Sequence, residues 1–278
     1  MIKKDLNSKI NILFELLRWN KPTGRLILLI PAGWSLYLTP ESNPSIYMLL
    51  KITIGGLLVS GLGCVANDDN GKYYTEDMRS CQVGFNGPGS DKEGTGTCVI
   101  LITPDAERTM LTNLGVSSML HPNNVDETII QNAKAVYVEG YLWTGEDTRK
   151  AGLEIAKIAK NKSIPVAFTL SDAFVVNTFK DSLTDFIQGN VDILFCNEVE
   201  AQAMTGEIDS RKAFDKLLAC VDTLFLTLGS KGSLAGKNSH APLQVGAFPV
   251  DAVDTTGAGD LYAAGALYGL INDLGLNF

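Results

Sequence analysis

The sequence is poor in histidine and in positive charge. Its 278 residues include two histidines, and 23 lysines and arginines stand against 31 acidic residues, which gives a formal net charge of −8. A nucleic-acid-binding surface needs clustered positive charge to neutralise phosphates, so this balance argues against a nucleic-acid partner. The histidines, His121 and His240, lie far apart in the chain and give little support to a histidine-based metal site or a Ser-His-Asp triad.

Cysteine motifs are also missing. The five cysteines are odd in number and scattered, and no two form a C-x-x-C pair of the kind that binds zinc. We therefore predict reduced, packed cysteines and a cytoplasmic location for the part of the chain that carries them. The sequence also has no G-x-x-x-x-G-K-[ST] phosphate-binding loop.

Charge is scarce between residues 26 and 67. Residues 26–40 carry none, and residues 42–67 carry only Lys51. Since a helix needs about 20 apolar residues to cross a bilayer, we expect two hydrophobic helices here and membrane association through residues 24–66. A buried hairpin is the alternative. Basic residues precede the first run, which favours a cytoplasmic N-terminus: Lys3, Lys4, Lys9, Arg18, Lys21 and Arg25.

After Asp69 the pattern is that of an α/β domain. Short β-rich runs alternate with polar segments suited to helices, which predicts βαβ units and a mainly parallel sheet covered by helices. Such sheets bind ligands beyond the carboxyl ends of their strands. The expected strands are 97–103, 135–140, 165–170, 192–197 and 223–229.

The stretch DAVDTTGAGDLYAAGALYGL, residues 251–270, is the most informative one. Gly257, Ala258 and Gly259 precede an apolar helix, whose first amides lack intrahelical partners and favour an anion such as phosphate. Asp260 is placed to accept a proton from an attacking hydroxyl during phosphoryl transfer. The alternative is an ordinary glycine turn in which Asp260 caps the helix.

Two further motifs each follow a predicted strand. In CNEVEA, Asn197 and Glu200 share one helix face and offer oxygen atoms suited to Mg²⁺, usually through water. In TLGSKGS, Thr227, Gly229 and Gly232 would let the backbone approach a nucleotide. Taken alone, the first motif also fits a plain helix start and the second a plain turn.

Together and in this order, NEVE, TLGSKG and DTTGAGD resemble the PfkB/ribokinase family of small-molecule kinases, from about Gly63 to the C-terminus. The resemblance implies a ribokinase-like three-layer α/β sandwich that uses ATP and Mg²⁺ to phosphorylate a sugar or nucleoside. It implies that Asp260 is the catalytic base and that residues 257–259 form the anion hole. The segment GTGTCVILITPDAERTMLTNLG resembles the family's substrate-side strand and turn, with Gly96, Arg108 and Asn113 as candidates.

A dinucleotide-binding fingerprint is a weaker alternative. Gly61, Gly63 and Ala66 match G-x-G-x-x-A, but a convincing preceding strand and the later acidic residue are missing.

The stretches LRWNKPTGRLILLIPAGWSLYL (residues 17–38) and GCVAND (residues 63–68) resemble a second family, the UbiA aromatic prenyltransferases. Those membrane enzymes hold Mg²⁺ and a prenyl diphosphate with an NDxxDxxxD motif. Asn67 and Asp68 match this motif, but Gly71 and Thr75 stand where it requires acids. The hexapeptide GCVAND also fits the G-x-V-G/A-x-D-x-x-G segment of the kinase family, through Gly63, Val65, Ala66, Asp68 and Gly71.

We therefore predict a junction of two proteins, with a membrane-type segment in residues 1–62 and a kinase domain in residues 63–278. By the resemblance, this kinase domain is truncated at both ends and impaired in turnover because acceptor-binding strands are missing. Two alternatives remain open: a membrane prenyltransferase fragment and a non-catalytic nucleotide-binding remnant.

Overall fold

A computed structural model of the chain describes residues 60–81, 83–85, 87, 89–102, 108–238, 240–250, 255 and 257–276. The two predicted hydrophobic helices lie outside these residues, as does the proposed membrane segment up to residue 59. Within the described ranges, no helix combines the length and apolarity needed to cross a membrane. Membrane association of residues 24–66 stays a prediction.

The chain divides into two compact units, one made of residues 1–61 and 72–85 and the other of residues 62–71 and 86–278. In the described part of the first unit, β1 (Ser60–Gly61) pairs in parallel with β3 (Gly84–Phe85). Helix α4 (Asp69–Ser80) includes residues of both units. The predicted division at residues 62 and 63 stays a prediction.

The second unit is built on a six-stranded sheet with the order β12-β11-β10-β9-β8-β7. Strands β7 to β10 run parallel, whereas β11 and β12 add antiparallel pairings at one edge. The predicted α/β fold and mainly parallel sheet are confirmed, although the sheet is mixed. Its strands are β7 (Val136–Glu139), β8 (Val166–Thr169), β9 (Ile193–Asn197), β10 (Thr223–Thr227), β11 (Ser233–Lys237) and β12 (Leu243–Val245).

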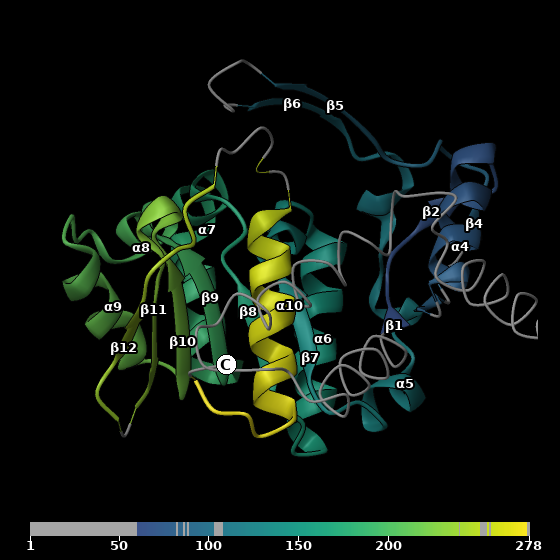
Figure 1. Cartoon of the computed structure of the whole chain (residues 1–278). Helices are drawn as coiled ribbons and strands as arrows, with labels where there is room; N and C mark the ends of the chain where they lie inside the picture. The colour runs from purple at the N-terminus through teal and green to yellow at the C-terminus, as the bar shows by residue number, and fades with distance from the viewer. Residues whose placement is uncertain are drawn as a thin grey trace, which may run out of the picture. The chain divides into compact units, whose positions relative to one another are not determined.

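Helices cover both faces of this sheet and make three layers. Helix α10 (Ala258–Ile271) packs on one face, as the yellow helix in Figure 1 shows. The other face is covered by α6 (Glu146–Asn161), α7 (Ala173–Asn190), α8 (Glu198–Thr205) and α9 (Ser210–Leu218). Because both faces are buried, the central strands read as continuous apolar runs rather than as alternating ones.

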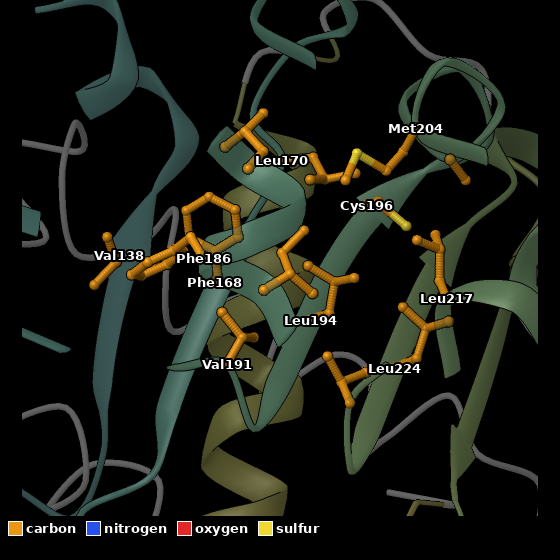
Figure 2. Close-up of a cluster of buried hydrophobic side chains, with 14 of the residues drawn as sticks. Val138, Phe168, Leu170, Phe186, Val191, Leu194, Cys196, Met204, Leu217 and Leu224 are labelled. Atoms are coloured by element: carbon orange, nitrogen blue, oxygen red, sulfur yellow. The ribbon is translucent and has the colours of Figure 1, made fainter. Parts of the chain in front are cut away.

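Side chains within one strand divide between the two layers with the period of two that a strand imposes. In β9, Leu194 and Cys196 enter the larger cluster drawn in Figure 2, with Phe168 and Leu224 from neighbouring strands. Their neighbour Phe195 points to the opposite face, into the cluster beneath α10. The sheet therefore has a core on each side.

The expected strand 97–103 forms β5 (Thr97–Ile102), but its assignment to the parallel sheet is wrong. It pairs antiparallel with β6 (Arg108–Asn113) in a separate two-stranded ribbon, visible apart from the main sheet in Figure 1. Apolar residues of this ribbon are largely exposed, including Val99 and Leu111. The apolar content of the run therefore reflected a hairpin rather than a buried central strand.

The dinucleotide-binding alternative is not supported by the local structure. That fingerprint needs its glycines to open a helix directly after a strand. Here Val65 and Ala66 form strand β2, which pairs in parallel with β4 (Gly89–Ser90), and the next helix begins only at Asp69.

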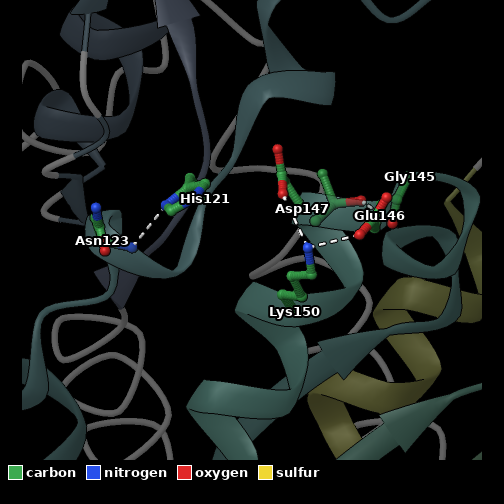
Figure 3. Close-up of polar contacts among 7 residues, drawn as sticks. His121, Asn123, Gly145, Glu146, Asp147 and Lys150 are labelled. Atoms are coloured by element: carbon green, nitrogen blue, oxygen red, sulfur yellow. Dashed lines mark hydrogen bonds and ion pairs between the residues drawn. The ribbon is translucent and has the colours of Figure 1, made fainter.

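Shorter elements join the ribbon to the sheet, namely the 3₁₀ helices η1 (Gly115–Met119) and η2 (Pro122–Asn124) and helix α5 (Glu127–Gln131). A third 3₁₀ helix, η3 (Gly140–Thr144), leads from β7 into α6. Figure 3 shows local polar contacts at η2 and at the start of α6. The backbone N–H of Asn123 donates to Nδ1 of His121 at 3.1 Å, so His121 caps η2 and is a turn residue. Lys150 lies 2.6 Å from Glu146 across the first turn of α6.

Candidate active site

The parallel strands end in polar residues along one edge of the sheet. Glu139, Thr169, Asn197 and Thr227 are the last residues of β7, β8, β9 and β10. Register pairs Glu139 with Thr169, and Asn197 with Thr227. Strand direction alone therefore gathers these polar groups at the edge where parallel sheets bind ligands.

Asn197 and Glu200 form a reciprocal cap at the start of α8. The backbone N–H of Glu200 donates to Asn197 Oδ1 at 2.8 Å, while the Glu200 carboxylate accepts from the side-chain and backbone N–H groups of Asn197 at 2.7 and 3.0 Å. The plain helix-start interpretation is thus correct as geometry. Burial raises the pKa of Glu200 to about 7, although the hydrogen bond from the Asn197 backbone opposes the rise.

Helix α10 presents its N-terminus at this edge. Gly257 is the N-cap residue, in the left-handed conformation with φ of 76°. Asp260 follows in the first turn with an exposed side chain, and the helix dipole favours negative charge there. The Ala258 N–H donates to the Thr255 carbonyl at 3.1 Å.

A row of aromatic rings holds α10 against the sheet. Phe195 and Phe225 stack with centroids 5.1 Å apart and planes 8° apart. Tyr137 lies 6.0 Å from Phe195 on one side, and Tyr262 of α10 lies 6.2 Å from Phe225 on the other. Because Tyr262 is in the same turn region as Asp260, this packing helps to place the aspartate.

The negative charges of several carboxylates at this edge raise the pKa values of neighbouring groups. Burial among protein atoms raises the pKa of Glu139, even though the residue keeps exposed surface, and the charge of Asp260 raises it further. Burial also raises the pKa of Tyr137, whose hydroxyl bonds to Thr169. The carboxylates that add to the rise at Tyr137 are Glu139, Asp260 and Glu200. The site therefore concentrates negative charge that a cation would offset.

A cavity of about 390 Å³ opens beside the Asn197 cap. Ser171, between β8 and α7, contributes to its wall with an uncommon positive φ of 66°. Asp172 caps α7 by accepting from the Phe174 N–H at 2.6 Å. The lining residues are Met110, Tyr141, Ser171, Asp172, Ala173, Asn197, Val199 and Glu200.

The predicted nucleotide residues lie at the next strand end. Thr227 closes β10, and Gly229 and Gly232 bracket the short turn η4 (Gly229–Lys231) that leads into β11. The Leu228 N–H donates to the Gly232 carbonyl at 2.7 Å and closes this turn. The Lys231 ammonium nitrogen lies 3.9 Å from a carboxylate oxygen of Glu198, so the turn lies near the start of α8.

The predicted substrate-side residues lie in the β5–β6 hairpin. Gly96 precedes β5, Arg108 opens β6, and Asn113 ends it opposite Thr97. Asn113 Oδ1 accepts from the Gly115 N–H at 3.2 Å, so this side chain stabilises the end of the hairpin. Among the hairpin residues that the structure describes, it is Met110 that lines the cavity.

Glu139, Tyr137 and Asp172 were missed by the sequence analysis. The sequence carries only a weak signal for them: each is a polar residue in or just after a predicted strand, where ligands of parallel sheets bind. No local pattern indicated that the charge of Asp260 would raise the pKa of Glu139. This interaction depends on where α10 packs against the sheet.

The donor atoms fit a metal held through water and phosphate rather than by protein alone. In the part of the chain that the structure describes, no three His, Cys, Asp or Glu side chains gather as a metal site. Both Glu200 oxygens are engaged by Asn197, which leaves contact through water as the natural mode. Mg²⁺ is commonly bound in this way, with several waters and substrate phosphates.

Asp68, which fits two family motifs, is fully engaged in the fold. Its carboxylate accepts from the Thr95 hydroxyl at 2.6 Å and from the backbone N–H groups of Thr95 and Gly71, both at 2.8 Å. A Cβ at Gly71 would lie 1.9 Å from the Ala66 carbonyl oxygen. The acid that the prenyltransferase motif requires at position 71 therefore has no room, which favours the kinase interpretation of GCVAND.

Comparison with known proteins gives matches of two kinds. A 4-hydroxybenzoate solanesyltransferase from Synechocystis sp. is 55% identical over 53 residues, 19% of this chain and 18% of that protein. Guanosine-inosine kinase from Escherichia coli is 34% identical over 140 residues, 49% of this chain and 32% of that protein, so the match spans about a third of the enzyme. The pair is compatible with the predicted junction.

Structural similarity agrees with the kinase match. The crystal structure of adenosine kinase from Sinorhizobium meliloti superposes with a TM-score of 0.76 and 34% identity, covering 81% of this chain and 71% of that one. Residues 56–277 match the family model of the pfkB family carbohydrate kinase. With the ribokinase-like fold and the strand-end site in place, the chain belongs to the pfkB family of carbohydrate kinases.

Proposed function

We propose that this chain transfers the γ-phosphoryl group of ATP to a hydroxyl of a nucleoside or sugar. The observation that carries the proposal is the position of Asp260, in the first turn of α10 and close enough to Glu139 to raise its pKa. A carboxylate beside a helix N-terminus unites a proton acceptor and an anion site, the two protein functions that phosphoryl transfer needs most.

Asp260 is proposed to take the proton of the acceptor hydroxyl as its oxygen attacks the γ-phosphorus. The new O–P bond forms while the bond to the β-phosphate oxygen breaks, and ADP leaves. The amides of Gly257, Ala258 and Gly259 would stabilise the charge on the transferred group. An exposed Asp260 is suited to this role because the acceptor must reach it.

Mg²⁺ would be held by the nucleotide phosphates and, through water, by Asn197 and Glu200. Bound there, the ion would neutralise phosphate charge and offset the surrounding carboxylates. Thr227, Gly229 and Gly232, at the β10 end, would contact the nucleotide.

A nucleoside is the preferred acceptor to test first. Both kinases compared at 34% identity are nucleoside kinases by name. The cavity beside Asn197 also offers a mixed wall, with the apolar Met110 and the ring of Tyr141 beside polar strand ends. Such walls bind a flat apolar ring and a polar sugar together.

The test is a phosphorylation assay of the full chain with ATP, Mg²⁺ and a panel of adenosine, guanosine, inosine, ribose and fructose. Turnover of one acceptor by the wild type is expected, and Asp260→Asn should lower kcat about 100-fold or more while leaving ATP binding unchanged. Asp273→Asn, beyond the other end of the same helix, is the matched control, since asparagine tolerates its positive φ.

Equal kcat values for wild type and Asp260→Asn would contradict the base assignment. ATP binding by the wild type without turnover of any acceptor would instead identify a nucleotide-binding remnant. The low turnover expected from the sequence remains a prediction, which the same assay measures.

A further inference from the structure

The base of the β5–β6 hairpin is joined to the region before α4 by a compact set of hydrogen bonds. Asp68 accepts three of them, two from Thr95 and one from Gly71. The Thr95 hydroxyl, while donating to Asp68, accepts from the Ala66 N–H at 2.9 Å. One threonine side chain thus links β2 to the residues that lead into β5.

Close backbone packing makes this joint rigid. Gly71 has no room for a side chain, as shown above, and a Cβ at Gly96 would lie 2.7 Å from the Leu114 carbonyl oxygen. The Val116 N–H donates to the Gly94 carbonyl at 3.0 Å, and the Val116 side chain is fully buried in a small core with Cys64 and Ala66. The two ends of the hairpin are therefore held together and to β2.

Beyond this base, most of the apolar side chains that the structure describes in the hairpin are poorly covered. The exposed fraction is 58% for Val99, 50% for Met110 and 59% for Leu111. Yet Met110 lines the same cavity as Asn197 and Glu200. Because apolar packing does not set the position of the hairpin, its base must do so.

We propose that Asp68 and Thr95 form a clip that holds the β5–β6 hairpin where Met110 closes the cavity, which makes Asp68 a positioning residue for the acceptor. This rests on the proposed function, in which the acceptor occupies the cavity. The nucleotide loop follows β10, whereas the cavity lies between the ends of β8 and β9. Asn197 and Glu200 stay fixed by their own cap in α8. Loss of the clip should therefore weaken acceptor binding more than ATP binding.

The test compares two substitutions at Thr95 in the full chain. Thr95→Val keeps the shape but removes the hydroxyl, whereas Thr95→Ser keeps the hydroxyl and should rescue the function. Thr112→Val is the matched control within the hairpin, because its hydroxyl lies 3.3 Å from the Cys98 sulfur on the exposed ribbon and not at the base.

Thr95→Val is expected to raise the acceptor KM about ten-fold, the equivalent of one strong hydrogen bond. The ATP KM and kcat should stay within about two-fold of the wild type. Equal changes in both KM values, or Thr95→Ser behaving like Thr95→Val, would overturn the proposal because a general loss of structure would then explain the effect. An unchanged acceptor KM would overturn it as well.

Amide hydrogen exchange separates the clip from the proposed function. Thr95→Val should speed exchange in β5 and β6 but leave β7 to β10 unchanged, and unchanged exchange in the hairpin would refute the clip whatever the assay shows. The proposed function would be contradicted if the wild-type chain phosphorylated none of the acceptors in the panel and if none of them altered its amide hydrogen exchange. The role of Asp68 in positioning the acceptor would then be rejected too. The amide exchange of Thr95→Val would still show whether the clip holds the hairpin.

Discussion

The six-stranded sheet and the β5–β6 hairpin carry neighbouring walls of one cavity, but they are held by different forces. The strands of the sheet are covered on both faces, and residues such as Leu194 and Leu226 are fully buried. The hairpin leaves Val99 and Leu111 more than half exposed and depends on hydrogen bonds at its base. Apolar burial thus places the strand ends of the candidate site, whereas polar contacts hold the hairpin that carries Met110.

This difference predicts which substitutions should lower stability and which should change the position of the cavity wall. A side chain removed from the sheet leaves a cavity in a close-packed core and lowers the free energy of unfolding. A side chain removed from the hairpin surface costs little stability, but a change at the hairpin base alters the position of a whole wall. The experiments below test the comparison, from the largest expected effect to the smallest.

The largest difference is expected between two identical substitutions in the two regions. Leu226→Ala should lower the free energy of unfolding by about 2–5 kcal/mol, because the side chain is fully buried in β10. Leu111→Ala should change it by less than about 0.5 kcal/mol, because this leucine is 59% exposed. Urea unfolding measures both values, and similar losses would show that the hairpin has a core of its own.

A smaller effect is expected at the first turn of α4, next to the hairpin base. Gly71→Ala should lower the free energy of unfolding by about 1–3 kcal/mol, because its Cβ would meet the Ala66 carbonyl oxygen at 1.9 Å. The matched control is Gly189→Ala in α7, where nothing lies within 4 Å of the added Cβ. Alanine should leave stability there unchanged or slightly raised. Equal losses at the two sites would mean that the clip region is loosely packed.

The smallest effect concerns acid pH. Hydrogen bonds from the Thr95 hydroxyl, the Thr95 backbone and the Gly71 backbone lower the pKa of Asp68 from 3.8 to about 2. Between these values the unfolded chain holds more protons than the native one, so this contribution to stability is present above pH 3.8 and is lost as the pH falls toward 2.

Asp68→Asn should therefore flatten the decline in stability across that window, measured by urea unfolding at several pH values. Asp185→Asn on the exposed surface of α7 serves as the control and should keep the wild-type profile. A wild-type profile in Asp68→Asn would show that its carboxylate does not hold the hairpin base.

The local structure at the three motifs was well predicted from the sequence, because its signals are local. NEVE does begin a helix at the end of a strand, since a cap joins residues three apart. The TLGSKG turn and the GAGD helix start also lie where their patterns place them. The roles assigned to Asp260, Asn197 and Glu200 stay proposals until they are tested.

The run TCVILIT shows the limit of such signals. Its apolar, β-branched composition indicates a strand, and β5 is one, but composition does not choose the pairing partner. The partner is the adjacent β6, and the pair stands outside the sheet. A buried strand and an exposed hairpin strand look alike until the tertiary structure shows what covers them.

The sequence by itself determined the α/β alternation, the apolar central strands and the glycine-rich start of α10, because these depend on residues a few positions apart. Only the tertiary structure decided that Asp68 bonds to Thr95, that Met110 reaches the cavity, and that Glu139 feels the charge of Asp260. These contacts join residues distant in the chain, and they depend on strand order and on the face that each helix covers, which no local pattern specifies.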